Sequence, residues 1–304
     1  MGKRLLFAWL AGLAPALAGA PLPVEEVAPG VFVHGGAQEE TSAANRGAIA
    51  NIGFVVGSRC VAVVDTGGSL SVGRGLREAV RARTALPVCY VINTHVHPDH
   101  LLGNAAFVGD KPQFVGHARL PAALAARART YLAALSRALG PAAGMTPLVP
   151  PDTSVQDTLI LDLGGRRLEL RAWPTAHTDQ DLTVFDEQTG TLWLGDLLFV
   201  ERIPVIDGSA RGWLQVTGAL RGLPVQRAVP GHGPVTVPWP AALEAQERYL
   251  ATLVEETRRA IKHRLTLQQA VDSVGLAERG KWLLFDLYHP RNVTAVYTEL
   301  EWED

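Results

Sequence analysis

Three histidines and an aspartate fall within the six residues HVHPDH at 95–100, directly after the β-forming run VCYVINT at 88–94. Side chains alternate along a strand, so we expect His95 and His97 to share one face where that strand ends. Pro98 cannot continue the ladder, and Asp99 and His100 follow it in a turn before a short helix. The segment thus offers two imidazoles in one direction and a carboxylate with a third imidazole in another. This layout suits two neighbouring metal ions, and it requires a fold that delivers further ligands to the same place.

Three more candidate ligands follow predicted strands elsewhere in the chain. His177 comes after LELRAWPTA, Asp196 ends TLWLGD, and His232 comes after RAVPG. In open α/β folds, functional groups gather at the carboxyl ends of strands. Four separate segments therefore predict one metal centre.

The order of predicted elements indicates two mixed sheets packed together with helices on their outer faces. The strands are expected at 31–34, 53–56, 61–65, 88–94, 113–115, 158–161, 168–173, 182–185, 191–195 and 226–230. The helices are expected at 71–84, 118–139, 213–220 and 241–263, with a last helical stretch at 267–274. A proline-rich link at 140–155 separates the two halves. We predict a catalytic domain at 21–240 and a helical extension at 241–304 that packs on the same domain.

The motifs HVHPDH (95–100), AHT (176–178), GD (195–196), PGHG (230–233) and DTGG (65–68), in this order, resemble the metallo-β-lactamase-fold hydrolases. The resemblance implies an αββα sandwich. It also implies that His95, His97 and His177 bind one metal, that Asp99, His100 and His232 bind a second, and that Asp196 bridges the two. Imidazole and carboxylate ligands without thiolate favour Zn²⁺, two per chain, although Fe or Mn also fit.

A dinuclear centre of this kind predicts a hydrolase. The two metals would share a water molecule, lower its pKa and present hydroxide to an acyl carbonyl, with Asp99 and Asp196 as the catalytic carboxylates. Asp196 at the bridging position resembles the thioesterase, lactonase and glyoxalase branches, whereas β-lactamases usually carry Cys or Ser there. The alternatives are a mononuclear iron oxidoreductase of the sulfur-dioxygenase type, a β-lactamase, and a binding protein without catalysis.

Four longer stretches resemble the exported quinoprotein relay system zinc metallohydrolases: NIGFVVG, AHTDQDLTVFD, GDLLFVERIPVIDGSARGWL and HPRNVTAVYTELEWE. This resemblance implies a functional link to PQQ-dependent alcohol oxidation. The HTDQ at 177–180 departs from the HTxG of many relatives, which weakens any transfer of substrate preference.

Residues around the predicted centre have two readings each. Arg202 either anchors an anionic substrate group or forms a salt bridge with Glu201 or Asp207. Asp65 and Asp181 either orient histidines or backbone near the site or act as turn and capping carboxylates. The helix at 118–139 either covers the site as a lid or packs on the sheet.

The N-terminus resembles a secretory leader. Lys3 and Arg4 precede an apolar run from Leu5 to Leu17 and the small residues Ala18-Gly19-Ala20. Thirteen apolar residues are too few to cross a bilayer core of about 30 Å as a helix. We therefore expect cleavage after Ala20 and a periplasmic or secreted protein with no stable membrane insertion; a retained anchor is the alternative.

The charge composition limits the classes of partner that we expect for this chain. The chain holds 28 Lys and Arg against 30 Asp and Glu, without a dense basic run, which argues against nucleic-acid binding. A small-molecule substrate is expected, and the C-terminal helices either form a homodimer or cap the domain. Cys60 and Cys89 start two strands that we expect to be adjacent, so they either form a disulfide or remain buried thiols.

Overall fold

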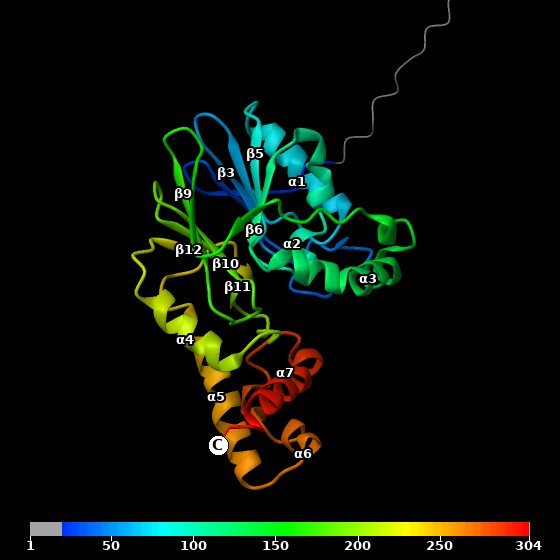
Figure 1. The fold of residues 1–304 in the computed structure, drawn as a ribbon, viewed down its shortest axis with the longest axis vertical. Helices are drawn as coiled ribbons and strands as arrows, with labels where there is room; N and C mark the ends of the chain where they lie inside the picture. The colour runs from blue at the N-terminus through cyan, green and yellow to red at the C-terminus, as the bar shows by residue number, and fades with distance from the viewer. Residues whose placement is uncertain (1–19, 304) are drawn as a thin grey trace, which may run out of the picture.

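The computed structural model describes residues 20–303, so the predicted leader lies almost entirely outside the described residues. Two β-sheets form the centre of the molecule (Figure 1). The first sheet is antiparallel from its first to its fourth strand and parallel from there to its seventh. Its strands, in spatial order, are β1 (Glu25–Ala28), β2 (Val31–His34), β3 (Ile52–Val56), β4 (Val61–Val64), β5 (Val88–Ile92), β6 (Gln113–His117) and β7 (Thr153–Val155).

The second sheet is also mixed, because only its β11–β12 pair is parallel. Its strands, in spatial order, are β12 (Arg227–His232), β11 (Thr191–Phe199), β10 (Leu182–Asp186), β9 (Arg167–Ala172) and β8 (Thr158–Asp162). Apolar side chains from both sheets, including Val33, Val64, Leu170 and Trp193, form one buried cluster. This cluster is the core between the two layers.

Helices cover the outer faces of both sheets. On the first sheet, α1 (Leu70–Arg83) begins where the Ser69 side chain accepts a hydrogen bond from the Val72 backbone, and it buries Val72 and Leu76 against strand residues. On the second sheet, α4 (Ala210–Arg221) and α5 (Leu243–Lys262) share a hydrophobic cluster with β11. The predicted αββα sandwich is therefore confirmed.

A C-terminal group of helices extends beyond the second sheet, as Figure 1 shows. α6 (Leu267–Val271) and α7 (Phe285–Leu300) pack together, and α7 also packs on α5. Their apolar residues continue the cluster that covers β11. No helix among residues 20–303 is long and apolar enough to cross a membrane.

Several element boundaries differ from the predictions. β5 ends at Ile92 rather than at residue 94, because the Thr94 backbone donates to the Asp65 carboxylate instead of a neighbouring strand. β11 continues through Asp196 to Phe199, where it pairs with the end of β12 after a register shift. The helix α7 and the short strands β1 and β7 were not predicted.

Cys60 and Cys89 form a disulfide, with their Cα atoms 5.8 Å apart. Cys89 lies in β5, and Cys60 directly precedes the neighbouring parallel strand β4. The sequence left open a disulfide or two buried thiols, and the structure contains the disulfide.

Candidate metal centre

All seven predicted ligands converge at one edge of the two sheets, in two groups. His95 follows β5, and the short helix α2 (Pro98–Leu101) begins after His97 and carries Asp99 and His100. The remaining three come from the second sheet: His177 from the loop after β9, Asp196 from the middle of β11, and His232 from the end of β12.

The prediction that His95 and His97 share a strand face was wrong. Both residues lie beyond the end of β5, and His97 occupies the cap position of α2. Their imidazoles are brought together by the loop and by the turn at Pro98, so the sheet pleat does not aim them.

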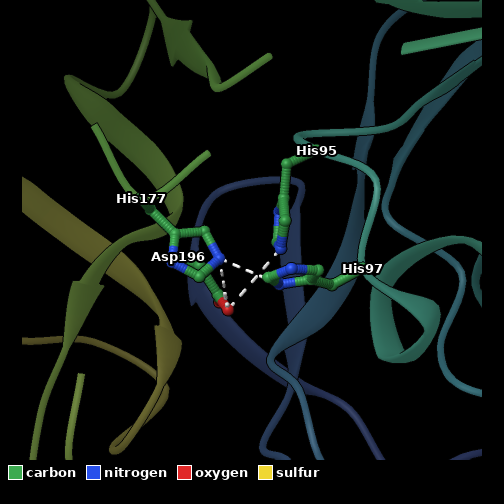
Figure 2. A group of neighbouring side chains, drawn as sticks. All are labelled: His95, His97, His177 and Asp196. Carbon is green, nitrogen blue, oxygen red and sulfur yellow. Dashed lines mark hydrogen bonds and ion pairs between the residues drawn. The ribbon is translucent and has the colours of Figure 1, made fainter. Parts of the chain in front are cut away.

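Figure 2 shows the first group, in which His95, His97 and His177 surround one side of Asp196. His97 Nδ1 lies 2.9 Å from His177 Nε2. Asp196 Oδ2 lies 3.6 Å from His95 Nε2 and 3.4 Å from His177 Nε2. Three imidazole nitrogens and one carboxylate oxygen therefore face a common point.

The other oxygen of Asp196 faces the second group. Oδ1 lies 3.1 Å from His100 Nε2 and 3.4 Å from His232 Nε2. Asp99 Oδ2 completes this group at 3.3 Å from His232 Nε2. One carboxylate thus stands between two sets of ligands, one oxygen toward each.

Gly231 makes the close approach of Asp196 to β12 possible. A β-carbon at this position would lie 2.0 Å from Asp196 Oδ1 and 2.7 Å from the backbone of Gly195. This steric limit is a structural reason for the glycine in PGHG.

Each imidazole uses its second nitrogen to hold its orientation. His177 Nδ1 donates to the Val205 carbonyl at 2.6 Å, and His232 Nδ1 donates to the Ile49 carbonyl at 2.9 Å. His97 Nε2 donates to Asp207 Oδ2 at 3.0 Å. Such outer hydrogen bonds fix the tautomer and the ring orientation of metal-binding histidines.

Asp65 connects one histidine of each group. Its Oδ2 accepts from His100 Nδ1 at 2.8 Å and from Thr94 Oγ1 at 2.7 Å, and Thr94 Oγ1 lies 3.0 Å from His95 Nδ1. Of the two readings for Asp65, the structure therefore agrees with the orienting one.

Asp181 acts on the chain next to the site. It accepts from the backbone and the hydroxyl of Thr178, which holds the turn after His177, and burial raises the pKa of Asp181 to about 8. Within the described residues it forms no hydrogen bond or ion pair with an imidazole, so it holds the backbone beside the site.

The electrostatics differ between the two groups. Burial and the neighbouring His97 lower the pKa of His177 to about 3, so its imidazole is neutral and has a lone pair to donate. Burial would also lower the pKa of His100, but the Asp196, Asp65 and Asp99 carboxylates outweigh it and raise that pKa. The second group thus holds negative charge that a proton or a cation must balance.

Unpartnered buried atoms test whether metals fit. Within residues 20–303, His95 Nε2, His100 Nε2 and Asp196 Oδ1 are buried polar atoms without a hydrogen-bond partner, and all three face the centre of the cluster. Leaving such atoms unsatisfied is costly. Imidazole nitrogens and carboxylate oxygens are the donors that divalent transition metals accept, so the residues fit a two-metal centre.

A cavity of about 640 Å³ opens over the centre. His97, Asp99, Asp196 and His232 lie at its base. Helix α3 (Leu120–Leu139) lines one side, and its buried leucines cluster with Val96 of the histidine segment and with Leu101 of α2. A cavity of this size suits a small-molecule ligand.

Arg202 also lines the cavity but is only 4% exposed. Its guanidinium donates to the Glu39 carbonyl at 3.0 Å and to Glu40 Oε1 at 3.1 Å, and it lies 3.3 Å from the Tyr288 hydroxyl. The predicted salt-bridge partners, Glu201 and Asp207, were wrong: Glu40 takes that role. Sequence reasoning also missed Asp207 as the carboxylate behind His97, because it lies in an irregular loop with no motif of its own.

The model of the metallo-beta-lactamase superfamily matches residues 45–232. A comparison of the sequence with curated proteins returns no match. Among solved structures, the metallo-beta-lactamase from Pontibacter korlensis is 19% identical with a TM-score of 0.61, and the alignment covers 76% of this chain and 99% of that one. The sec-alkylsulfatase Pisa1 from Pseudomonas sp. is 17% identical with a TM-score of 0.69, covering 94% of this chain and 51% of that one. At these identities, the structures share the fold.

Proposed function

Because the chain belongs to the metallo-beta-lactamase superfamily of metal-dependent hydrolases, we propose that it is an exported dinuclear zinc hydrolase that cleaves an acyl bond in an ester, thioester or lactone. The observation that carries this proposal is the position of Asp196, whose two oxygens each lie 3.1–3.6 Å from imidazole nitrogens of a different ligand group. A lone mononuclear site would not need a second set of ligands.

When bound, the two cations supply a hydroxide nucleophile at neutral pH and polarise the acyl carbonyl. The protein's own part is to hold the ligands rigid and to move a proton. Phe199 stacks on His232 with ring centroids 5.0 Å apart, and Trp213 packs against His177. These two imidazoles are therefore held against buried aromatic rings. Asp99 lines the cavity, where its carboxylate takes the proton of the nucleophile and passes it to the leaving group.

Activity with zinc-loaded protein tests this proposal. The full chain is assayed on an aryl ester, a thioester, a lactone and a β-lactam, together with Asp196→Ala and with a control, Asp162→Ala, at the exposed end of β8. We expect hydrolysis of at least one acyl substrate, lowered by roughly two orders of magnitude or more in Asp196→Ala only, with unchanged circular dichroism.

Three results would contradict the proposal. An unchanged rate in Asp196→Ala would refute the bridging role. One iron per chain with oxygen consumption would favour the iron oxidoreductase, and failure on every substrate would favour a binding protein.

Export and the quinoprotein link belong to the same proposal. The leader pattern supports export, and the Cys60–Cys89 disulfide supports an oxidising compartment, since such bridges form outside the cytosol. The four stretches that resemble quinoprotein-associated hydrolases support a role beside PQQ-dependent alcohol oxidation. Mass spectrometry of protein from the periplasmic fraction should find Pro21 as the first residue; an intact Met1 in the membrane fraction would contradict export.

A further inference from the structure

Three arginines line the cavity over the metal centre, and they differ in how many hydrogen bonds they make to the protein. The guanidinium of Arg202 is buried and tied to Glu39, Glu40 and Tyr288. Arg127 on α3 and Arg291 on α7 are more open, with side chains 33% and 58% exposed. Arg202 keeps only its buried Nε without a partner, whereas Arg127 and Arg291 keep most of their N–H groups open to a ligand.

Arg127 and Arg291 converge on a single carboxylate. Arg127 Nη2 lies 3.3 Å from Asp207 Oδ2, and Arg291 Nη2 lies 3.7 Å from Asp207 Oδ1. Asp207 also accepts the hydrogen bond from His97 Nε2, so the two arginines stand one residue away from the metal ligands. α3 lies in the middle of the chain and α7 near its C-terminal end (Figure 1).

The charges around Asp207 do not balance. One carboxylate faces two guanidinium groups, so this local group carries one more positive than negative charge. Of the other carboxylates on the cavity, Glu40 pairs with Arg202, and Asp99 and Asp196 face the ligand histidines. Arg127 makes one hydrogen bond to Asp207, and Arg291 makes none within residues 20–303. Each guanidinium has five N–H donors, so most of them remain available for an anion.

We propose that Arg127 and Arg291 bind an anionic group of the substrate, so that the substrate is an acyl compound with a negatively charged tail remote from the bond that is cleaved. Paired guanidinium groups recognise carboxylates through strong charge-assisted hydrogen bonds. The cavity holds both this pair and the metal centre, so one ligand can occupy both. This inference rests on the proposed acyl hydrolase activity.

A matched pair of substrates tests the charge requirement. One is the 4-nitrophenyl half-ester of adipic acid, with a free carboxylate; the other is the same compound with that carboxylate capped as a methyl ester. We expect the zinc-loaded wild-type protein to prefer the half-ester through a lower KM. Arg127→Gln and Arg291→Gln together should raise the KM for the half-ester by about tenfold to a hundredfold. The KM for the capped ester should not change.

Two control variants separate recognition from structure. Arg129→Gln changes an exposed arginine on the same helix that does not line the cavity, and it should alter neither KM. Arg127→Lys retains the charge and should recover part of the preference. If the double variant lost activity on both esters equally, the arginines would only hold α3 and α7 in place, and the inference would be overturned. A wild-type protein without preference would overturn it as well.

Binding of the product distinguishes failure of this inference from failure of the proposed function. Calorimetry of zinc-loaded protein should show tighter binding of adipate than of monomethyl adipate, and the double variant should lose this difference. If neither ester is hydrolysed but the difference in binding is present, the acyl hydrolase proposal fails and the anion site stands. Equal binding of the two ligands by the wild-type protein would overturn the anion site whatever the activity.

Discussion

Single side chains set the geometry of the metal centre, and the position of Asp196 depends on a neighbouring residue that has no side chain. Its approach to β12 requires the missing side chain of Gly231, and its own position in β11 follows a register shift at Gly195. Irregularities of this kind often re-aim a side chain next to an active site. The bridging geometry is therefore a property of backbone and side chain together.

Gly231→Ala should displace Asp196 and weaken metal binding. The added β-carbon would lie 2.0 Å from Asp196 Oδ1 and 2.7 Å from the backbone of Gly195, so it would meet fixed backbone as well as a side chain. We expect zinc affinity, measured by competition with a chromophoric chelator, to fall by about tenfold to a hundredfold. Gly218→Ala is the matched control, because that glycine lies in α4 with open space around it. Equal affinities in both variants would argue against the steric role.

At the scale of secondary structure elements, much of the fold could be predicted from local patterns. Strand runs and the ligand motifs depend on neighbouring residues, so the sandwich and the seven converging residues were found. α7 was missed because Pro290 interrupts its pattern and because it buries polar residues, including His289 and Asn292. Asp207 was missed as the hydrogen-bond acceptor of His97 because the two residues are 110 positions apart in the sequence. Their contact depends on how the loop folds, and no local sequence pattern predicts it.

His289 makes the packing of α7 on α5 sensitive to acid. Its ring is buried, its Nε2 donates to the Val274 carbonyl and its Nδ1 accepts from the Tyr249 hydroxyl, so the folded state holds it neutral; burial lowers its pKa below the ordinary 6.5. Below pH 6.5 the unfolded chain binds this proton more readily than the folded one, so stability must fall as the pH falls.

Denaturant unfolding at pH 5 and pH 7.5 measures this effect. The loss of unfolding free energy between the two values should be smaller in His289→Gln than in the wild-type protein. An identical loss in both proteins would show that His289 does not contribute to the acid sensitivity.

Across the whole molecule, the disulfide and the leader pattern both support the proposed export. The bridge joins β4 and β5, the strands that precede Asp65 and the histidine segment, and it closes a loop with a sequence separation of 29 residues. Cross-linking a loop of this length stabilises a fold by about 2–4 kcal/mol. The bridge therefore adds stability at the starts of β4 and β5, the ends of these strands that lie away from Asp65 and His95.

Removal of the bridge should destabilise the protein without removing its metals. Cys60→Ala with Cys89→Ala should lower the free energy of unfolding by about 2–4 kcal/mol in guanidinium titrations. The zinc content of the folded variant should match that of the wild-type protein, because neither cysteine contacts a ligand group. Loss of zinc with an unchanged free energy of unfolding would show that the bridge supports metal binding and not the stability of the fold.

One carboxylate joins two complete ligand groups, and the metal stoichiometry of the protein tests this arrangement. Elemental analysis of protein reconstituted with zinc should give two zinc ions per wild-type chain. Asp99→Ala combined with His232→Ala removes ligands of the second group only and should leave one zinc ion, held by His95, His97, His177 and Asp196. One metal ion per wild-type chain, unchanged by the double substitution, would contradict the account.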